Sequence, residues 1–219
     1  MIPKGMHFWY WLLGWFPCRM IGRFYFRSTI LHVDRVPATG GCILAGNHAS
    51  FFDPFLLGSS PLREISYLAR ASAFWFPMGA YLRVCNAVPM DREGGGLKGM
   101  LKIIDILKKG NGITLFPEGT RTHDGKLQPA KAGIGLIVIK SGAPVVPVRI
   151  FGSYEAWNRH MIFPRPRPMT VKYGHPINFD ALRKEAETCS KERLKQIYQE
   201  VSDRIMAEIG AMQPTPDPE

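Results

Sequence analysis

Two kinds of apolar pattern alternate along the chain and indicate its secondary structure. Short runs that are apolar at almost every position are typical of buried strands. Such runs occur at residues 42–47, 65–70, 112–116, 143–153 and 169–177. Longer segments with apolar residues three and four apart are typical of helices, and they occur at 94–110, 131–142 and 191–210. The alternation predicts an α/β fold: a single domain with a mostly parallel or mixed central sheet flanked by helices.

Prolines suggest where several of these elements begin and end. Asp53 followed by Pro54 predicts the start of a short helix with Asp53 as its cap, because proline is favoured in the first helical turn and aspartate just before it. A second helix is expected over 72–84, with Pro77 in its first turn. Pro117 is expected to end the strand that precedes it.

The first residues differ in character from the rest of the chain. The segment FWYWLLGWFPC at 8–18 is densely aromatic and lies between two basic residues. It is too short to cross a bilayer, which takes about 20 apolar residues, and Pro17 is expected to interrupt a helix there. Tryptophan and tyrosine favour the headgroup region of membranes, so a membrane-interfacial helical segment is predicted. The alternative is an N-terminal helix packed on the core.

Three parts of the chain are therefore expected. Residues 1–34 form the aromatic membrane-associating segment, residues 35–210 form the folded domain, and residues 211–219 form a disordered tail. The membrane segment predicts a protein associated with the membrane, peripheral or monotopic, on its cytoplasmic face.

Charge narrows the class of partner. The 219 residues include 28 Lys and Arg against 18 Asp and Glu, a formal net charge of +10. A basic surface attracts nucleic acid, an anionic membrane face or small phosphorylated substrates. No strand with the alternating aromatic and basic residues of RNA-binding folds is present, so nucleic acid is not expected as a partner. The four cysteines are far apart and form no Cys-x-x-Cys pair, which favours a reducing compartment without disulfides.

The strongest candidate for catalysis is the segment GNHASFFDP at 46–54. A loop between a strand and a helix could bring Asp53 against one imidazole nitrogen of His48 and leave the other nitrogen basic, as in a general base oriented by a carboxylate. The alternative is that Asp53 only caps the helix and His48 lies in a turn. The sequence has no Gly-x-Ser-x-Gly nucleophile motif, so the base would act on a hydroxyl of the substrate.

A second candidate, FPEGTR at 116–121, follows another predicted strand. Gly119 lets backbone amides approach a ligand, Thr120 offers a hydroxyl, and Arg121 can bind a phosphate with two parallel hydrogen bonds. The alternative is a surface turn with an incidental arginine. No metal or nucleotide motif is present, so neither a metal nor a cofactor is expected.

In this order, NHASFFD, NAVPMDR, FPEGTR and APVVPV resemble the four motif blocks of the 1-acylglycerol-3-phosphate acyltransferase family of glycerolipid acyltransferases. The resemblance covers roughly residues 35–180. It implies transfer of an acyl group from an acyl thioester, either acyl-CoA or an acyl carrier protein, to the free hydroxyl of 1-acylglycerol-3-phosphate (lysophosphatidic acid). The product is phosphatidic acid, an intermediate of phospholipid biosynthesis.

The resemblance also implies a role for individual residues. His48 deprotonates the acceptor hydroxyl and Asp53 orients it. Arg92, with Glu118, Gly119 and Arg121, binds the glycerol phosphate, and Pro147 in the fourth block shapes the acyl-binding side. Two alternatives stay open: another lysophospholipid or a lipid-A-type acceptor for the same chemistry, or a basic peripheral membrane protein without catalysis.

Overall fold

The computed structural model describes residues 6–90 and 96–217, apart from the side chain of Leu97. Its centre is a seven-stranded sheet of order β1-β7-β6-β2-β5-β3-β4. The strands are β1 (Thr29–Leu31), β2 (Cys42–Gly46), β3 (Ile65–Arg70), β4 (Ala87–Met90), β5 (Gly112–Leu115), β6 (Val145–Phe151) and β7 (Thr170–Tyr173). All neighbours are parallel except β6 and β7. The predicted α/β fold with a mostly parallel, mixed sheet is confirmed.

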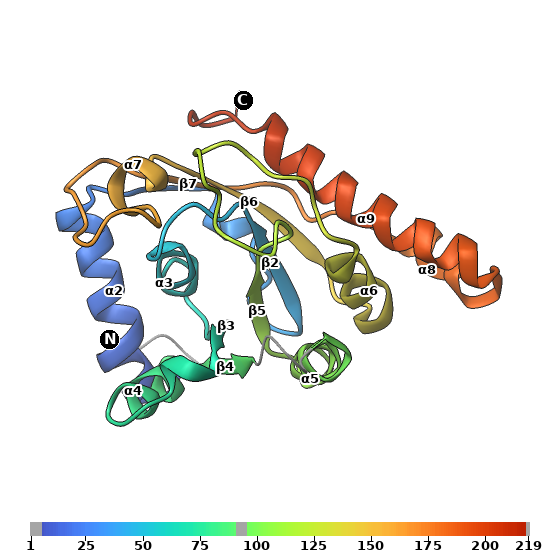
Figure 1. Ribbon diagram of the computed structural model, residues 1–219, viewed down its shortest axis with the longest axis horizontal. Coiled ribbons are helices and arrows are strands. Elements are labelled where there is room, and N and C mark those ends of the chain that lie inside the picture. The colour runs from blue at the N-terminus through green and yellow to red at the C-terminus, as the bar shows by residue number, and fades with distance from the viewer. Residues whose placement is uncertain (1–5, 91–95, 218–219) are drawn as a thin grey trace.

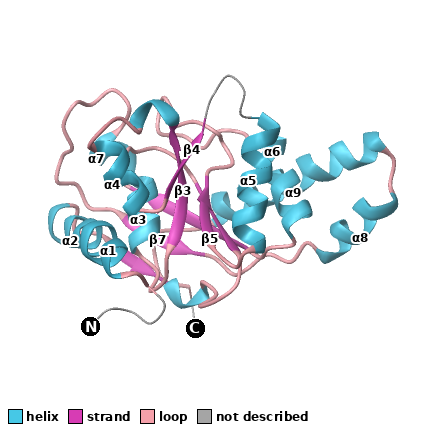
Figure 2. Cartoon of the chain, turned by 90° about the horizontal axis from the view of Figure 1, so that it is seen from below, coloured by secondary structure: helices cyan, strands magenta, loops and turns pink. Residues whose placement is uncertain are grey.

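Helices cover both faces of this sheet (Figures 1 and 2). They are α3 (Asp53–Ser59), α4 (Met78–Val84), α5 (Gly96–Lys108), α6 (Ala132–Ser141), α7 (Ser153–Trp157), α8 (Asp180–Thr188) and α9 (Lys191–Ala211). Single 3₁₀ turns lie at Val33–Arg35 and Ala71–Ala73. Helices α5, α6 and α9 pack on one face, whereas α3 and the N-terminal helix pack on the other. Successive residues of β2 alternate between the two cores, as the pleat requires: Ile43 points into the first and Leu44 into the second.

Several elements differ from the sequence-based expectations. Strand β1 and helices α7 and α8 were not predicted. The helix expected over 72–84 begins only at Met78, directly after a turn at Phe76–Pro77.

The close approach of α6 and α9 depends on one glycine. A Cβ atom at Gly135 would overlap the backbone carbonyl of Tyr198 in α9. The amide of Gly135 also donates a hydrogen bond to the Ser202 hydroxyl, with 3.1 Å between the two atoms. A larger residue at 135 would therefore force the two helices apart.

The aromatic N-terminal segment is helical from Phe8 to Tyr25. Two α-helical stretches, α1 (Phe8–Tyr10) and α2 (Phe16–Met20), alternate with π-helical turns at Trp11–Trp15 and Ile21–Tyr25. Pro17 was expected to interrupt a helix, and this expectation was wrong. A proline ring clashes with the carbonyl four residues earlier in a regular α-helix, and the wide π-helical turn directly before Pro17 changes that spacing.

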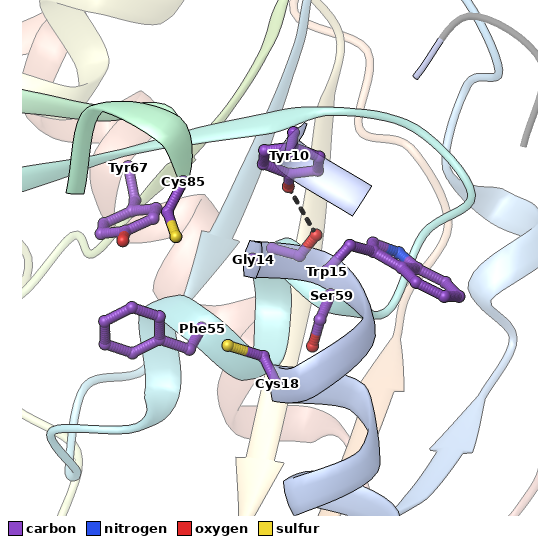
Figure 3. A pocket seen from close by; sticks show the side chains of 9 residues that line it. Tyr10, Gly14, Trp15, Cys18, Phe55, Ser59, Tyr67 and Cys85 are labelled. Atoms are coloured by element: carbon purple, nitrogen blue, oxygen red, sulfur yellow. Dashed lines mark hydrogen bonds between the residues drawn. The ribbon is translucent and has the colours of Figure 1, made fainter. Parts of the chain in front are cut away.

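One face of this N-terminal helix packs on the domain. Figure 3 shows Tyr10, Gly14 and Cys18 directed at a small space whose other walls come from α3, β3 and the end of α4. The Tyr10 hydroxyl donates to the Gly58 carbonyl at 3.1 Å, and the Trp15 indole donates to the Pro61 carbonyl at 2.8 Å. This face of the N-terminal helix therefore fits the second sequence-based alternative, a helix packed on the core.

The opposite face of the N-terminal helix is apolar and open to solvent. Its exposed large apolar side chains are Phe8, Trp9, Leu12, Leu13, Phe16, Ile21, Phe24 and Tyr25. None of the helices in the described ranges is both long and apolar enough to span a bilayer.

The end of the chain contacts the sheet. Asp217 forms ion pairs with Arg35 and with Lys172, whose own side chain is nearly buried in β7. Hydrogen bonds from Lys172 and Arg35 lower the pKa of Asp217 to about 2. The described part of the expected tail, residues 211–217, thus contacts the sheet through this carboxylate.

Candidate active site

The loop that carries His48 follows β2 and is fixed from both sides. The side-chain amide of Asn47 pairs with the backbone of Ile150 in the neighbouring strand β6: its Nδ2 donates to the carbonyl at 3.0 Å, and its Oδ1 accepts from the amide at 2.7 Å. The imidazole ring of His48 stacks on Phe116, with ring centroids 3.9 Å apart. The loop of His48 is therefore held by β6, and its imidazole ring is held by Phe116, the residue that follows β5.

Asp53 lies behind His48 and is completely buried. Its Oδ2 is 3.0 Å from Nδ1 of His48 and also accepts hydrogen bonds from the amides of Ala49 and Ser50, both at 2.7 Å. Asp53 is the first residue of α3, and its carboxylate turns back into the loop, away from the helix. The expectation that it caps the helix was wrong, because the loop amides and the imidazole take its oxygen.

This geometry leaves the second imidazole nitrogen, Nε2, for a substrate. Nδ1 is engaged by the carboxylate, and His48 itself lines a pocket. A carboxylate on Nδ1 fixes the tautomer in which Nε2 is basic. The structure thus brings the two sequence-predicted residues together in the arrangement of a general base and its orienting group.

The FPEGTR loop joins the His48 loop directly. The Thr122 amide donates to the His48 carbonyl at 2.8 Å. In return, the His48 amide donates to Oε1 of Glu118 at 2.8 Å, and the Gln128 amide donates to Oε2 at 3.1 Å. The two predicted motifs are therefore one hydrogen-bonded unit at the carboxyl ends of β2 and β5, where ligands of such sheets are expected.

Glu118 has a different place from the one expected for a substrate-binding residue. Its side chain is only 2% exposed, and both carboxylate oxygens accept hydrogen bonds from backbone amides. Burial raises the pKa of Glu118 above its usual value, against the opposing effect of these two hydrogen bonds. Glu118 holds the loops of His48 and Gln128 in position and does not line the pocket.

The other residues of FPEGTR, except Pro117, line the pocket. Gly119, Thr120 and Arg121 all line it, and Gly119 has a φ of +70°, which favours glycine at this position. The guanidinium of Arg121 lies over the ring of Phe51, 3.5 Å from its centroid. The loop therefore presents a hydroxyl and a cation beside His48.

The pocket has a volume of about 330 Å³ and extends along the ends of β3, β4 and β5. Its described lining is His48, Leu68, Ala69, Arg70, Met90, Thr114, Leu115, Phe116, Gly119, Thr120, Arg121 and Arg159. Three arginines from separate parts of the chain thus surround one histidine, and this combination suits an anionic substrate. Within the described ranges, no group of three or more His, Cys, Asp or Glu residues could hold a metal ion.

Two of these arginines were missed in the sequence. Arg70 is the last residue of β3, so the rule that ligands bind beyond the carboxyl ends of parallel strands could have identified it. Arg159 comes from the segment after α7, and no local pattern marks it; its Nη1 donates to the Arg121 carbonyl at 3.3 Å. Arg92 lies outside the described residues, and Met90, the last residue of β4, lines the pocket.

Pro147, the residue expected to shape the acyl-binding side, lies within β6. It pairs with Ala45 of β2, and its carbonyl accepts from the Gly174 amide at 2.8 Å. It does not contribute to the pocket that contains His48.

Comparisons with known proteins agree with this architecture. The chain is 32% identical over 143 residues to a 1-acyl-sn-glycerol-3-phosphate acyltransferase of Limnanthes douglasii, which covers 63% of this chain and 50% of that protein. It is 29% identical over 180 residues to the protein of that name in Bacillus subtilis, which covers 80% and 85%. The chain spans about half the length of the plant relatives it matches first.

A solved structure has a similar fold. The crystal structure of the 1-acyl-sn-glycerophosphate acyltransferase PlsC from Thermotoga maritima superimposes with a TM-score of 0.66 at 25% identity, over 90% of this chain and 80% of that one. Residues 27–151, more than half of the chain, match the family described as Acyltransferase. This match includes His48, Asp53 and the FPEGTR loop, and the chain belongs to the Acyltransferase family.

Proposed function

We propose that this protein transfers an acyl group from an acyl thioester, acyl-CoA or acyl carrier protein, to the free hydroxyl of 1-acylglycerol-3-phosphate and so makes phosphatidic acid. The observation that carries the proposal is the buried Asp53 behind His48, at the edge of a pocket with three arginines. The relatives named 1-acyl-sn-glycerol-3-phosphate acyltransferase support the same acceptor.

The proposed reaction uses the hydroxyl of the acceptor as nucleophile. His48 takes the proton of that hydroxyl through Nε2 while the oxygen attacks the thioester carbon. The carbon–sulfur bond then breaks, and the proton passes from His48 to the departing thiolate. Asp53 stabilises the imidazolium that forms during attack.

The phosphate of the acceptor is proposed to bind the cationic rim of the pocket. Arg121 is the sequence-predicted member of this rim, together with Gly119 and Thr120 of the same loop; Arg92 is proposed from the sequence alone. Arg70 and Arg159 add two further cations to the pocket wall. Glu118 contributes by fixing the loop, since both of its carboxylate oxygens accept hydrogen bonds from backbone amides.

The exposed face of the N-terminal helix is proposed to rest in the interfacial region of the cytoplasmic face of a membrane. Aromatic side chains such as Trp9, which is 61% exposed, favour the headgroup region. Trp75 and Phe76, 61% and 87% exposed, precede α4, and α4 contacts the N-terminal helix at Trp11–Trp15 (Figure 1). Such a surface places the protein where an amphiphilic acceptor is found.

The catalytic proposal is tested with purified full-length protein, an acyl-CoA and a panel of acceptors. Thiol release should depend on 1-acylglycerol-3-phosphate and exceed that with lysophosphatidylcholine, a lipid-A precursor or monoacylglycerol. His48→Ala should lower kcat by about 10²–10⁴, the usual effect of removing a general base. His175→Ala, an exposed histidine outside the pocket, is the matched control and should keep wild-type kcat. Wild-type turnover by His48→Ala, or thiol release without any acceptor, would contradict the proposal.

The membrane proposal is tested by vesicle sedimentation. The double variant Trp9→Ser/Phe24→Ser removes two exposed side chains of the N-terminal helix without touching its buried face. Its binding should fall by at least tenfold, because burying each such side chain is worth about 1.5–3 kcal/mol. Wild-type protein should stay bound in 1 M salt, where the Debye length is about 3 Å. Complete release by salt would show that the attachment is only electrostatic.

A further inference from the structure

A loop far from the N-terminus in sequence exposes two adjacent large apolar residues. Residues 158–169 connect α7 to β7, and within this loop Ile162 and Phe163 are 84% and 79% exposed. Each of these values is higher than that of any exposed apolar side chain on the N-terminal helix. Large apolar side chains exposed side by side mark a surface that another apolar phase covers.

The backbone of this loop, which exposes Ile162 and Phe163, is held by hydrogen bonds and prolines. The Arg165 amide donates to the Ala156 carbonyl at 2.8 Å, and the Met161 amide donates to the Asn158 carbonyl at 3.2 Å. Prolines at 164, 166 and 168 restrict the backbone between the apolar tip and β7. The loop therefore holds Ile162 outward with little conformational freedom to hide it.

The same loop is fastened to the end of the N-terminal helix. The Tyr25 hydroxyl donates to the Pro164 carbonyl at 2.8 Å, and Nη2 of Arg27 donates to the Pro166 carbonyl at 3.2 Å. Figure 1 shows the loop after α7 beside the far end of this helix from α4. Phe24, 75% exposed, is the neighbour of Tyr25. The apolar tip of the loop is thus attached to the apolar surface of the helix.

Positive charge accompanies the apolar tip. Arg165 and Arg167 are exposed and line a surface groove under the loop, in which Glu155 is the one acidic side chain among the described lining residues. Arg27 lies against the same loop. Arginines directly beside exposed apolar residues are the combination that binds anionic lipid headgroups above an inserted apolar anchor.

We propose that the 158–169 loop is a second membrane-docking element. Ile162 and Phe163 enter the boundary between headgroups and acyl chains, and Arg165 and Arg167 bind the phosphates of anionic lipids. This inference rests on the proposed membrane contact of the N-terminal helix and adds a contact at its far end. Arg159, at the start of the loop, lines the catalytic pocket, so docking of the loop brings the pocket to the membrane surface.

Vesicle sedimentation with two lipid compositions tests the proposal. Vesicles of phosphatidylcholine alone are neutral, and vesicles that also contain phosphatidylglycerol are anionic. Ile162→Ser/Phe163→Ser should weaken binding to both kinds, by roughly tenfold for each apolar side chain removed. Arg165→Gln/Arg167→Gln should weaken binding to anionic vesicles by about fivefold for each arginine and leave binding to neutral vesicles unchanged.

Two matched controls come from α5, on the other face of the sheet. Leu101→Ser removes an apolar side chain that is 56% exposed, and Lys98→Gln/Lys102→Gln removes two exposed cations. Both controls should bind both kinds of vesicle like the wild type, and circular dichroism should show that every variant is folded. Wild-type binding by Ile162→Ser/Phe163→Ser would overturn the proposal.

Two further outcomes separate this inference from the proposed function. If Trp9→Ser/Phe24→Ser loses binding and the loop variants do not, the helix alone docks and the second element is refuted. If the arginine pair loses binding to neutral vesicles as strongly as to anionic ones, the loop does not recognise headgroup charge, and that part is refuted. Neither result depends on acyl transfer, so failure of the catalytic proposal would leave this inference standing.

Discussion

The carboxylate of Asp53 offers a test that separates catalysis from folding, because one oxygen serves both. Oδ2 accepts hydrogen bonds from the amides of Ala49 and Ser50 and from Nδ1 of His48. In Asp53→Asn, the side-chain carbonyl can keep these three contacts, while the negative charge is lost. In Asp53→Ala, all three contacts are lost.

The expected losses of activity and of stability in these variants can be worked out separately. An imidazolium and a carboxylate about 4 Å apart attract each other by about 4 kcal/mol at an effective dielectric constant of about 20. Losing that attraction in the transition state lowers kcat by roughly 10³ in both variants. Asp53→Asn also weakens hydrogen bonds to a charged acceptor and buries an amide at the site of Oδ1, which has no hydrogen-bond partner among the described residues. We expect this to lower the free energy of unfolding by about 1–3 kcal/mol.

Asp53→Ala should be much less stable for the same loss of activity. It leaves two buried amides without an acceptor, at about 1–3 kcal/mol each, in addition to the cavity. Steady-state kinetics with the acyl donor and 1-acylglycerol-3-phosphate measures kcat, and urea unfolding measures the free energy. If Asp53→Asn kept kcat within a few fold of wild type, the charge of Asp53 would have no part in the reaction. If both variants were equally unstable, the hydrogen bonds to the loop amides would not support the fold as argued.

Three other changes test separate parts of the molecule. Arg121→Lys should lower kcat/KM for 1-acylglycerol-3-phosphate by roughly ten- to a hundredfold, because an ammonium keeps the charge and loses the planar fork; an equal loss with monoacylglycerol would exclude a phosphate contact. Gly135→Ala should destabilise the fold by about 1–3 kcal/mol by forcing α6 from the Tyr198 carbonyl. Gly133→Ala, which meets only a flexible methionine side chain, should match or exceed wild-type stability in the same urea titration. The pKa of Asp217 is lowered to about 2 by its lysine and arginine partners, so its ionised form stabilises the fold above the ordinary value of 3.8, and this stabilisation is lost as the pH falls through 2. Asp217→Asn should therefore have a lower Tm than wild type at pH 6, and this difference in Tm should shrink as the pH falls from 4 through 2; a constant difference in Tm would contradict the ion pairs.

The elements that the sequence predicts well are those whose pattern comes from burial. Strand β2 is buried at every residue, and α9 repeats apolar residues at helical spacing, so each is visible from its own residues. Helix α8 has no buried residue, and β1 has only three residues, all at least partly exposed. Strand β1 forms through its pairing with the distant strand β7, and three residues are too few to carry a periodic signal.

In the site, too, the sequence predicts residues that are close together in the chain better than residues placed by distant contacts. His48 and Asp53 lie five residues apart, so a strand followed by a helix is enough to place them together. The orientation of Glu118 depends on amides of His48 and Gln128, and the sequence alone favoured a ligand-facing role. Arg159 reaches the pocket only because β6 and α7 bring its segment back over the FPEGTR loop. Its role follows from topology, which local motifs do not contain.

Because the proposed acceptor is a lipid, its binding at the membrane and its reaction at His48 must be coordinated, and Arg159 lies between the two regions involved. An acyl chain costs free energy to withdraw from a membrane, about 0.8 kcal/mol for each CH₂ group, so the enzyme gains by leaving the chain in the bilayer and drawing only the glycerol phosphate to His48. That requires the phosphate-binding loop to lie close to the membrane surface. Arg159 belongs to the proposed docking loop and hydrogen-bonds to the backbone of Arg121, so one contact joins the two loops. A loop that docks on the bilayer would thereby also fix the height of the FPEGTR loop above it.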